Sequence, residues 1–313
     1  MASPAAPPGV QRVTDRPGRP LVSGLLIAAA GSITFSGKAI IVKLSYRYGV
    51  DAVTVIMLRM LFALPIFLAM AWWAGRGKEA LSGRDWVGVV GLGFSGYYFS
   101  SMLDFLGLQY VTASLERLIL YLNPTLVMLL GWLLYGRRWR ATQVLGMAVS
   151  YCGVLLVLGR ELRLEGANVG LGAALIFAST VSYACYMVYS GELVKRLGSL
   201  RLVGLATSVA CVLCVVQYAV LRPPATALDI APAVVWLALL NATLCTAVPV
   251  LLVMMAIERI GPAATAQTGM IGPLTTIAMG VWLLGEPFTA WLVAGTVLVI
   301  AGIFVFSAPA RAA

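Results

Sequence analysis

The chain lacks histidine altogether and carries little charge for its length. Of its 313 residues, 11% are charged and 61% are hydrophobic, whereas soluble domains contain about 25% charged residues. A water-soluble protein of this make-up would have too little charge to cover its surface. The absence of histidine removes the commonest metal ligand and the usual proton shuttle. We therefore expect a membrane protein without a metal site or cofactor, in which any proton coupling depends on carboxylates.

Cysteine is scarce as well. The five cysteines all fall within apolar segments, and "CVLC" at residues 211–214 provides one CxxC spacing. A single pair of this kind without histidine is weak support for metal or redox chemistry, so we interpret the cysteines as packing residues. The net charge of +10 is read as membrane topology and not as nucleic-acid binding, because Lys and Arg collect in short loops.

Long hydrophobic runs, by contrast, are plentiful, and the mean hydropathy is +0.94. A membrane-spanning helix needs about 20 predominantly apolar residues. Runs of this length bounded by charges, Pro or Gly predict an all-α polytopic membrane protein with ten helices, at residues 21–44, 52–73, 86–108, 112–135, 141–159, 169–190, 201–221, 233–257, 263–284 and 288–307.

The segments outside these helices are short. Residues 1–20 are rich in Pro and Arg and predict a disordered cytoplasmic tail. The apolar run that follows resembles a signal peptide, but it continues through Ile41 and is long enough to span, so we expect an uncleaved first helix. Residues 160–168 are predicted to form an external linker, and residues 308–313 a second cytoplasmic tail.

Basic residues are distributed unevenly between alternate loops. With the N-terminus placed in the cytoplasm, fourteen of the 22 basic residues fall in inside segments, five fall in outside loops, and Lys38, Arg59 and Arg117 lie within spans. Cytoplasmic loops of membrane proteins carry an excess of Lys and Arg. We therefore expect both termini in the cytoplasm and the protein in the inner (plasma) membrane.

The two halves of the chain repeat each other. Residues 123–159 align with residues 272–307 at an offset of 149, so that Gly and Pro recur at matching positions: Pro124 with Pro273, Gly131 with Gly280, Gly146 with Gly295 and Gly153 with Gly302. The start of each half matches more faintly, as in Gly24 with Gly172 and Phe35 with Tyr183. We infer a duplication, with residues 21–159 as the first five-helix repeat and 169–307 as the second.

An odd number of helices in each repeat has a consequence for topology. The second repeat must enter the membrane from the opposite side, which makes the repeats inverted. Inverted repeats are the architecture of many secondary transporters, which expose a site near the midplane to each side in turn. The duplication therefore predicts a secondary transporter that works by alternating access.

The second repeat also carries a recognisable segment, "PLTTIAMGVWLLGEPFTAWLVAGTVLVIAGIFVF" at residues 273–306. Its proline, the glycine seven residues on, the "GEP" with Glu286 and the final "AGIFVF" resemble the closing segment of an EamA repeat in the drug/metabolite transporter (DMT) superfamily. The resemblance covers residues 21–307. The first repeat departs from it, because "YGRRW" has Arg137 where the repeat usually has glutamate. Among relatives, the chain is similar to the bacterial YddG-type exporters of aromatic and other neutral amino acids.

Charged residues inside the predicted spans are candidates for function. Lys38, Asp104 and Arg117 are predicted to lie at similar depth, nearer the outside, with Glu116 beside Arg117. An ion pair between Asp104 and either base would make the burial of both tolerable. The pair is either purely structural or part of an outer gate or substrate site. For Arg59, a structural ion pair is the expectation and a substrate contact is the alternative.

The polar and aromatic residues of the spans gather on the predicted helices 1, 3, 4, 6, 8 and 9, which line the central cavity in the resembled family. Pro124 and Pro273 are expected to break helices 4 and 9 and to act as hinges. The remaining candidates for the substrate cavity, beside Lys38, Asp104 and Arg117, are Thr34, Tyr97, Tyr98, Ser101, Tyr121, Asn123, Ser179, Tyr183, Tyr186, Asn241 and Gln267.

The resemblance and these residues together predict a small-molecule exporter that is not an enzyme. A zwitterion suits a cavity that carries both Asp104 and the bases, so amino acids leaving the cytoplasm are the expected cargo. Exporters of drug-like cations or other metabolites remain an alternative, and so do a channel and an integral-membrane enzyme. The sequence does not determine the driving force or the oligomeric state; a monomer is one option.

Overall fold

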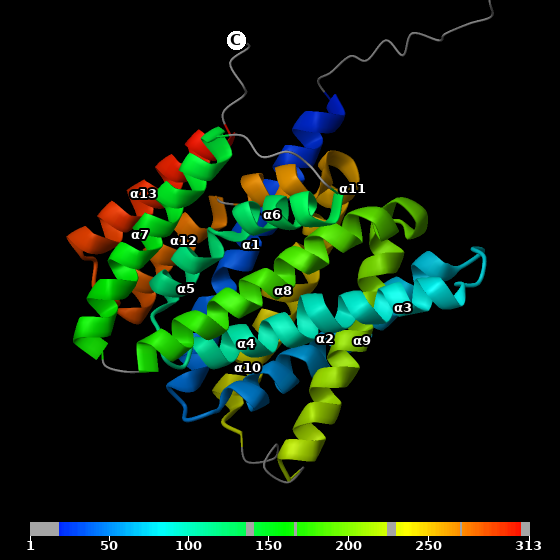
Figure 1. Cartoon of the computed structure of the whole chain (residues 1–313). Helices are drawn as coiled ribbons and strands as arrows, with labels where there is room; N and C mark the ends of the chain where they lie inside the picture. Colours follow the sequence, from blue (N-terminus) through cyan, green and yellow to red (C-terminus); the bar gives the residue numbers. More distant parts are fainter. Residues whose placement is uncertain (1–18, 136–140, 166–167, 224–229, 270, 308–313) are drawn as a thin grey trace, which may run out of the picture.

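The computed structural model describes residues 19–135, 141–165, 168–223, 230–269 and 271–307. Within these ranges the regular structure is helical throughout, and no strand occurs. The helices pack into one bundle, and the first turn of α1 and the last turn of α13 lie at the same end of it (Figure 1). The expectation of an all-α fold is confirmed.

Helices of the first repeat follow the predicted spans closely. They are α1 (Arg19–Tyr46), α2 (Ala52–Gly75), α3 (Gly83–Leu92), the π-helix η1 (Gly93–Phe99), α4 (Ser100–Gly107), α5 (Ala113–Leu120), α6 (Asn123–Tyr135) and α7 (Ala141–Glu165). The predicted third span therefore comprises α3, η1 and α4 in succession. Helix α7 continues six residues into the segment predicted as an external linker.

The second repeat contains α8 (Asn168–Leu197), α9 (Ser199–Leu221), α10 (Pro232–Ala242), the π-helix η3 (Thr243–Ala247), α11 (Val248–Thr268), α12 (Ile271–Met279), the π-helix η4 (Gly280–Leu284) and α13 (Ala290–Ser307). Within α11, Gly261 has a φ of 79° and is followed by Pro262, so the chain turns there between two helical stretches. This turn separates the predicted eighth and ninth spans.

Six helical stretches of the described chain are long and apolar enough to cross a membrane. They are Val22–Tyr46, Ala52–Gly75, Ala113–Leu134, Asn168–Leu197, Ser199–Leu221 and Pro232–Pro262. Shorter apolar helices occur at Val144–Val157, Thr275–Leu284 and Ala290–Gly302. The chain is thus a multi-pass membrane protein, while the count of ten spans stays a prediction.

Helices α7 and α13, which close the two repeats, pack against each other in opposite directions (Figure 1). A Cβ placed on Gly153 would lie 2.6 Å from the carbonyl oxygen of Gly295, and one on Gly302 would lie 2.5 Å from that of Gly146. Halfway between, Ser150 donates a hydrogen bond of 3.3 Å to the carbonyl of Val299. Since Ser150 and Val299 are equivalent at the offset of 149, the repeats meet across a pseudo-two-fold axis that inverts one relative to the other.

The first helix of each repeat also packs against the other repeat. Gly24 of α1 packs against Arg259 and Ile260 at the turn in α11, and Gly172 of α8 packs against Tyr110 and Val111 just after α4. Tyr110 and Val111 precede Arg259 and Ile260 by 149 residues. Each repeat therefore places its first helix against the third helix of the other repeat, which joins the two halves into one core.

Two of the π-helices also occupy matching places. Segment η1 covers residues 93–99 and η3 covers 243–247, so a shift of 149 residues superimposes η3 on the middle of η1. Such wider turns are rare inside α-helices and are frequent at functional sites. Gly96 in η1 packs directly against the ring of Tyr186, so this segment lets α8 approach the cavity wall.

Candidate substrate cavity

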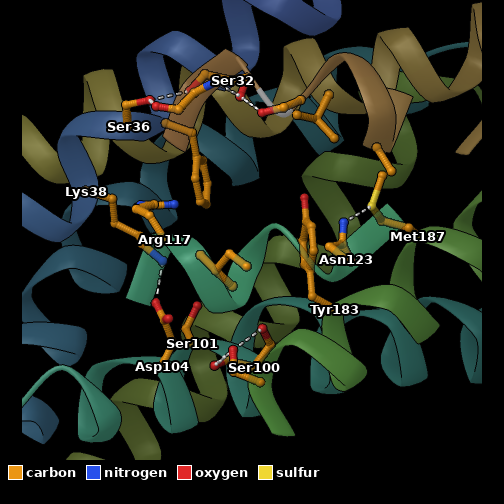
Figure 2. A pocket seen from close by; sticks show the side chains of 18 of the residues that line it. Ser32, Ser36, Lys38, Ser100, Ser101, Asp104, Arg117, Asn123, Tyr183 and Met187 are labelled. Carbon is orange, nitrogen blue, oxygen red and sulfur yellow. Dashed lines mark hydrogen bonds and ion pairs between the residues drawn. The ribbon is translucent and has the colours of Figure 1, made fainter. Parts of the chain in front are cut away.

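A cavity of about 140 Å³ lies between the two repeats. Its walls come from α1, α2, η1, α4, α5, α8, η3 and α11, from the first residues of α6 and α12, and from the breaks that precede these two helices. Charged residues gather on one side of it, and Tyr183, Asn123 and Met187 on the other (Figure 2). An engineered apolar cavity of about 150 Å³ holds one benzene molecule. The space in this conformation therefore suits a group about as large as a phenyl ring.

On the charged side, Lys38 of α1 forms an ion pair with Asp104 of α4 (Figure 2). The two side chains are 6% and 3% exposed. The Lys38 ammonium also lies 3.7 Å from Glu116 Oε1 and 5.1 Å from the ring centroid of Phe35. Of the two partners expected for Asp104, Lys38 and Arg117, the structure pairs it with Lys38. This partner makes a lysine in the middle of a membrane helix tolerable.

Glu116 and Arg117 extend this cluster from α5. Glu116 is completely buried, and its Oε2 lies 2.9 Å from Arg117 Nε. Neither atom has a hydrogen bond of good geometry in the described structure, and Arg117 Nη2 is likewise buried without one. Arg117 is thus paired by charge but retains unfilled donor capacity next to the cavity.

Arg59 of α2 departs from the structural ion pair expected of it. The residue is 2% exposed and lines the cavity. Among the residues that the structure describes, no carboxylate oxygen lies within 4.0 Å of it, and its buried Nε and Nη2 atoms make no hydrogen bond. Its guanidinium carbon lies 4.6 Å from the centroid of the Phe105 ring, which is within the range of a cation–π contact.

Tyrosines form the neutral side of the cavity. The ring of Tyr97 meets that of Tyr186 edge-on at 5.0 Å, and Tyr183 stacks on Tyr186 at 5.5 Å. Tyr97 and Tyr186 also share a hydrogen bond between their hydroxyls, at 3.2 Å. Tyr97 and Tyr183 face the cavity, while Tyr186 is fully buried behind them and holds both in place.

The break before α12 is supported by serines of α1. Ser36 Oγ donates to the carbonyl of Gly272 at 2.7 Å, the amide of Gly272 donates to Ser32 Oγ at 3.1 Å, and Ser32 Oγ donates in turn to the carbonyl of Gly269. The backbone groups that the interrupted helix leaves unpaired thus find partners on a neighbouring helix, as membrane burial requires. The first repeat has a comparable interruption at Tyr121 and Leu122, just before Pro124.

One end of the bundle is held by Glu286, the residue of the "GEP" segment. Its carboxylate accepts hydrogen bonds from the amides of Ala113 and Ser114, at 2.7 and 3.1 Å, and from Ser114 Oγ at 2.6 Å. An anion at a helix N-terminus is favoured because the first amides there have no partner within the helix. Glu286 therefore ties the turn between η4 and α13 to the start of α5.

Most of the residues predicted from the sequence come together in the cavity. Its lining includes Lys38, Tyr97, Ser101, Asp104, Arg117, Tyr121, Asn123, Ser179, Tyr183 and the predicted hinge residue Pro124. The turn of the chain at Gly261 and the interruption near Gly269 place α11 beside them. For Gln267 and Pro273, the side chains fall outside the described part of the structure.

Four predicted residues lie outside the lining. Thr34 donates to the carbonyls of Ala30 and Gly31 in its own helix, and Tyr98 packs on Phe94. Asn241 is completely buried in α10, and Tyr186 stands behind the wall. Polarity alone does not tell which face of a helix a residue occupies.

Sequence reasoning left out several residues of the wall. Ser32, Phe35 and Ala28 of α1 line it and are spaced i, i+4 and i+7 when read from Ala28, which places them on one helical face. That spacing was available in the sequence. Met187 gave no such signal, because an apolar residue in an apolar helix does not stand out; it accepts from Asn123 Nδ2 at 3.2 Å.

Comparison with known proteins agrees with the two-repeat architecture. The model of the EamA-like transporter family matches residues 22–159 and again residues 170–308. The chain belongs to the EamA-like transporter family. The resemblance seen in the "GEP" segment is thereby confirmed, and membership implies a membrane transporter with a small-molecule substrate in a lipid bilayer.

Related transporters cover most of the chain. A Bacillus subtilis (strain 168) protein named "uncharacterized transporter YcbK" is 30% identical over 278 residues, which are 86% of this chain and 87% of the relative. An "uncharacterized transporter" of Archaeoglobus fulgidus is 22% identical over 90% of this chain and 96% of its own. One crystal structure shares the fold with a TM-score of 0.67 at 19% identity, over 92% of this chain and 98% of that one.

Proposed function

We propose that this EamA-family transporter exports small amino acids, aromatic and other neutral ones among them, by alternating access around the central cavity. The observation that carries the proposal is a cavity between inverted repeats with charged residues on one side and tyrosines on the other. An amino acid has the same division, because a charged α-carbon end is joined to a neutral side chain.

Alternating access requires that the two repeats exchange roles. The exchanged packing of α1 with α11 and of α8 with α4 provides two equivalent interfaces, one of which can tighten while the other opens. We propose that the interruptions before Pro124 and Pro273 act as the hinges of this motion. The hydrogen bonds between Glu286 and the start of α5 join the two repeats in the present conformation.

The proposed orientation follows the uneven distribution of Lys and Arg. Both chain ends are assigned to the cytoplasm and the protein to the inner membrane. The common position of the first turn of α1 and the last turn of α13 supports this assignment (Figure 1). Export, as opposed to import, rests on the family resemblance.

The alternatives fit the cavity less well. A cation exporter would place a positive substrate beside Lys38, Arg59 and Arg117, which outnumber the carboxylates of Asp104 and Glu116. Charges of like sign at short distance repel one another in a low-dielectric site. An enzyme needs an activated nucleophile, and the serines of the described lining have no histidine beside them, because the chain contains none.

Exchange in proteoliposomes tests the proposed cargo. Liposomes that contain the purified protein and unlabelled phenylalanine take up labelled phenylalanine, and an external panel of amino acids competes for entry. We expect saturable uptake that aromatic and neutral amino acids reduce, while strongly acidic and basic ones do not. Uptake no greater than that of protein-free liposomes, from a protein shown to be folded, would reject the amino-acid assignment.

A further inference from the structure

The charged side of the cavity is not electrically balanced. Its described charged groups are three cations, Lys38, Arg59 and Arg117, and two anions, Asp104 and Glu116. With every group ionised, one positive charge is left over, and protonation of either carboxylate would increase the excess. All five residues are at most 5% exposed, so bulk water does little to screen it.

The excess charge can be assigned to one residue. Asp104 is paired with Lys38, and Glu116 is paired with Arg117, with Lys38 at a longer distance. Arg59 has no carboxylate within 4.0 Å in the described part of the chain, and two of its nitrogens are buried without a hydrogen bond. The face of Phe105 orients the guanidinium, but an aromatic ring cannot cancel its charge.

We propose that Arg59 and the unfilled donors of Arg117 bind the carboxylate of the substrate, so that the recognised class is a monocarboxylate with an apolar or aromatic body. This inference rests on the proposed function, because it concerns the same cavity. A single negative charge brings the site to neutrality, which a dianion such as a phosphate monoester would overshoot. Guanidinium groups match a carboxylate with two parallel hydrogen bonds.

The amino group of the substrate has a smaller part in this scheme. Both carboxylates already have a cation as charge partner: Asp104 pairs with Lys38 (Figure 2), and Glu116 lies beside both Arg117 and Lys38. Asp104 Oδ1 and the two oxygens of Glu116 make no hydrogen bond, but a further ammonium group there would stand next to these cations. A carboxylate that lacks the amine should therefore bind about as well as the amino acid itself. This departs from the expectation that a zwitterion suits the cavity because it carries both Asp104 and the bases.

Three ligands with the same benzyl body separate the two groups: phenylalanine, 3-phenylpropionate and phenylalaninamide. Thermal unfolding of the purified protein measures binding, since a ligand that binds the folded state raises Tm. We expect saturable shifts with the first two and an apparent affinity at least about tenfold weaker for the amide, a factor that corresponds to ~1.4 kcal/mol. A Tm raised by the amide and not by 3-phenylpropionate would overturn the inference. The absence of a Tm shift with all three ligands would overturn it as well.

Substitution of Arg59 distinguishes binding from a structural role. Arg59→Met removes an uncompensated buried charge, so the ligand-free protein should keep or raise its Tm, while the shift with 3-phenylpropionate disappears. Lys195→Met, which removes a cation that is 68% exposed, should leave both unchanged. A lower ligand-free Tm for Arg59→Met with an intact carboxylate shift would show that Arg59 is structural and would overturn the inference.

Two further measurements keep the possible failures apart. If chloride stabilises the protein saturably and carboxylates do not displace it, Arg59 holds an inorganic counter-ion and the inference falls. In the exchange assay, entry of phenylalanine that phenylalaninamide competes equally well would preserve the proposed function and reject the carboxylate site. Entry of 3-phenylpropionate without entry of phenylalanine would preserve the carboxylate site and reject the proposed amino-acid cargo.

Discussion

Lys38 and Asp104 illustrate how a single buried pair can be both a stabilising contact and part of a site. Each residue is buried, and each compensates the charge of the other. Removal of one partner from a buried pair costs about 3–5 kcal/mol because it leaves an unpaired charge, whereas replacement of both partners is often neutral. Substitution of one residue of the pair should therefore destabilise the protein more than substitution of both.

Lys38→Met should consequently lower the Tm of the purified protein and abolish exchange, because Asp104 is left without its ammonium partner. The double variant with Asp104→Asn should recover most of the lost Tm, and recovery of Tm without recovery of exchange would assign the pair to function. Thermal unfolding and uptake are measured on the same preparations. A single Lys38→Met variant with unchanged stability and transport would contradict the placement of Lys38 against Asp104.

At the surface, Asp51 and Arg222 join the start of α2 to the end of α9. Arg222 Nη2 lies 2.6 Å from Asp51 Oδ2, and Asp51 also accepts from the amide of Thr54 at 3.2 Å. Burial alone would raise the pKa of Asp51, but the hydrogen bonds from Thr54 and Arg222 outweigh it and hold the pKa below its ordinary value of 3.8. The carboxylate form is therefore the one that the fold stabilises.

This pair gives a pH dependence with a defined sign. A group whose pKa is lowered by folding contributes stability above its unfolded pKa, and that contribution is lost as the pH falls through the folded value. Arg222→Gln should thus lower Tm slightly at neutral pH, and the difference from the original protein should shrink below pH 3.8. A difference in Tm that grows on acidification would contradict this account.

At the scale of the elements, Glu286 is the contact that holds a turn of the second repeat on a helix of the first. It accepts hydrogen bonds from the first two amides of α5, which have no partner within the helix. Comparable caps at helix N-termini are worth about 0.5–2 kcal/mol.

Glu286→Ala should lower the free energy of unfolding by an amount in this range, which is seen as a lower Tm, and should also change the exchange rate, because the contact joins the two repeats at one end of the bundle. Glu192→Gln is the matched control, since the exposed Glu192 lies 3.3 Å from Lys195 in a surface pair of little energetic value. Equal Tm values and rates for the two variants would show that the Glu286 contact does not hold the two repeats together.

Apolar length and loop charge predict the helices well, and the reasons are physical. A membrane forces the backbone into helices, so a run of about 20 apolar residues leaves few alternatives. The π-helices η1, η3 and η4 were not predicted, because a widened turn follows from packing between helices, as where Gly96 meets Tyr186. The extension of α7 to Glu165 was missed because charged residues were taken as the end of the helix.

The charged part of the site was predictable from the sequence, because a charged residue inside a membrane needs a partner of opposite charge. On that ground Asp104 could be assigned a basic partner, Lys38 or Arg117, although not which of the two. The tyrosines of η1 and α8 followed from the helices on which they occur. Arg59 could not be placed in this way. That it lacks a carboxylate depends on how α2 packs against α4, which no pattern in the sequence reveals.

At the scale of the whole molecule, the duplicated and inverted repeats define what motion is available. Equivalent residues such as Ser150 and Val299 touch each other on the pseudo-two-fold axis between α7 and α13. The exchanged contacts of α1 and α8 lie away from that axis, around the cavity. We therefore expect α7 and α13 to stay packed while the two exchanged interfaces open in turn.

Counterflow of phenylalanine tests this central claim most directly. Proteoliposomes loaded with a high concentration of unlabelled phenylalanine are diluted into a trace of labelled phenylalanine, and internal label is followed with time. A carrier that alternates between two sides exchanges one molecule for another, so labelled phenylalanine should rise transiently above its equilibrium level and then decline. A monotonic approach to equilibrium without this overshoot would indicate a passive pore and would contradict the account.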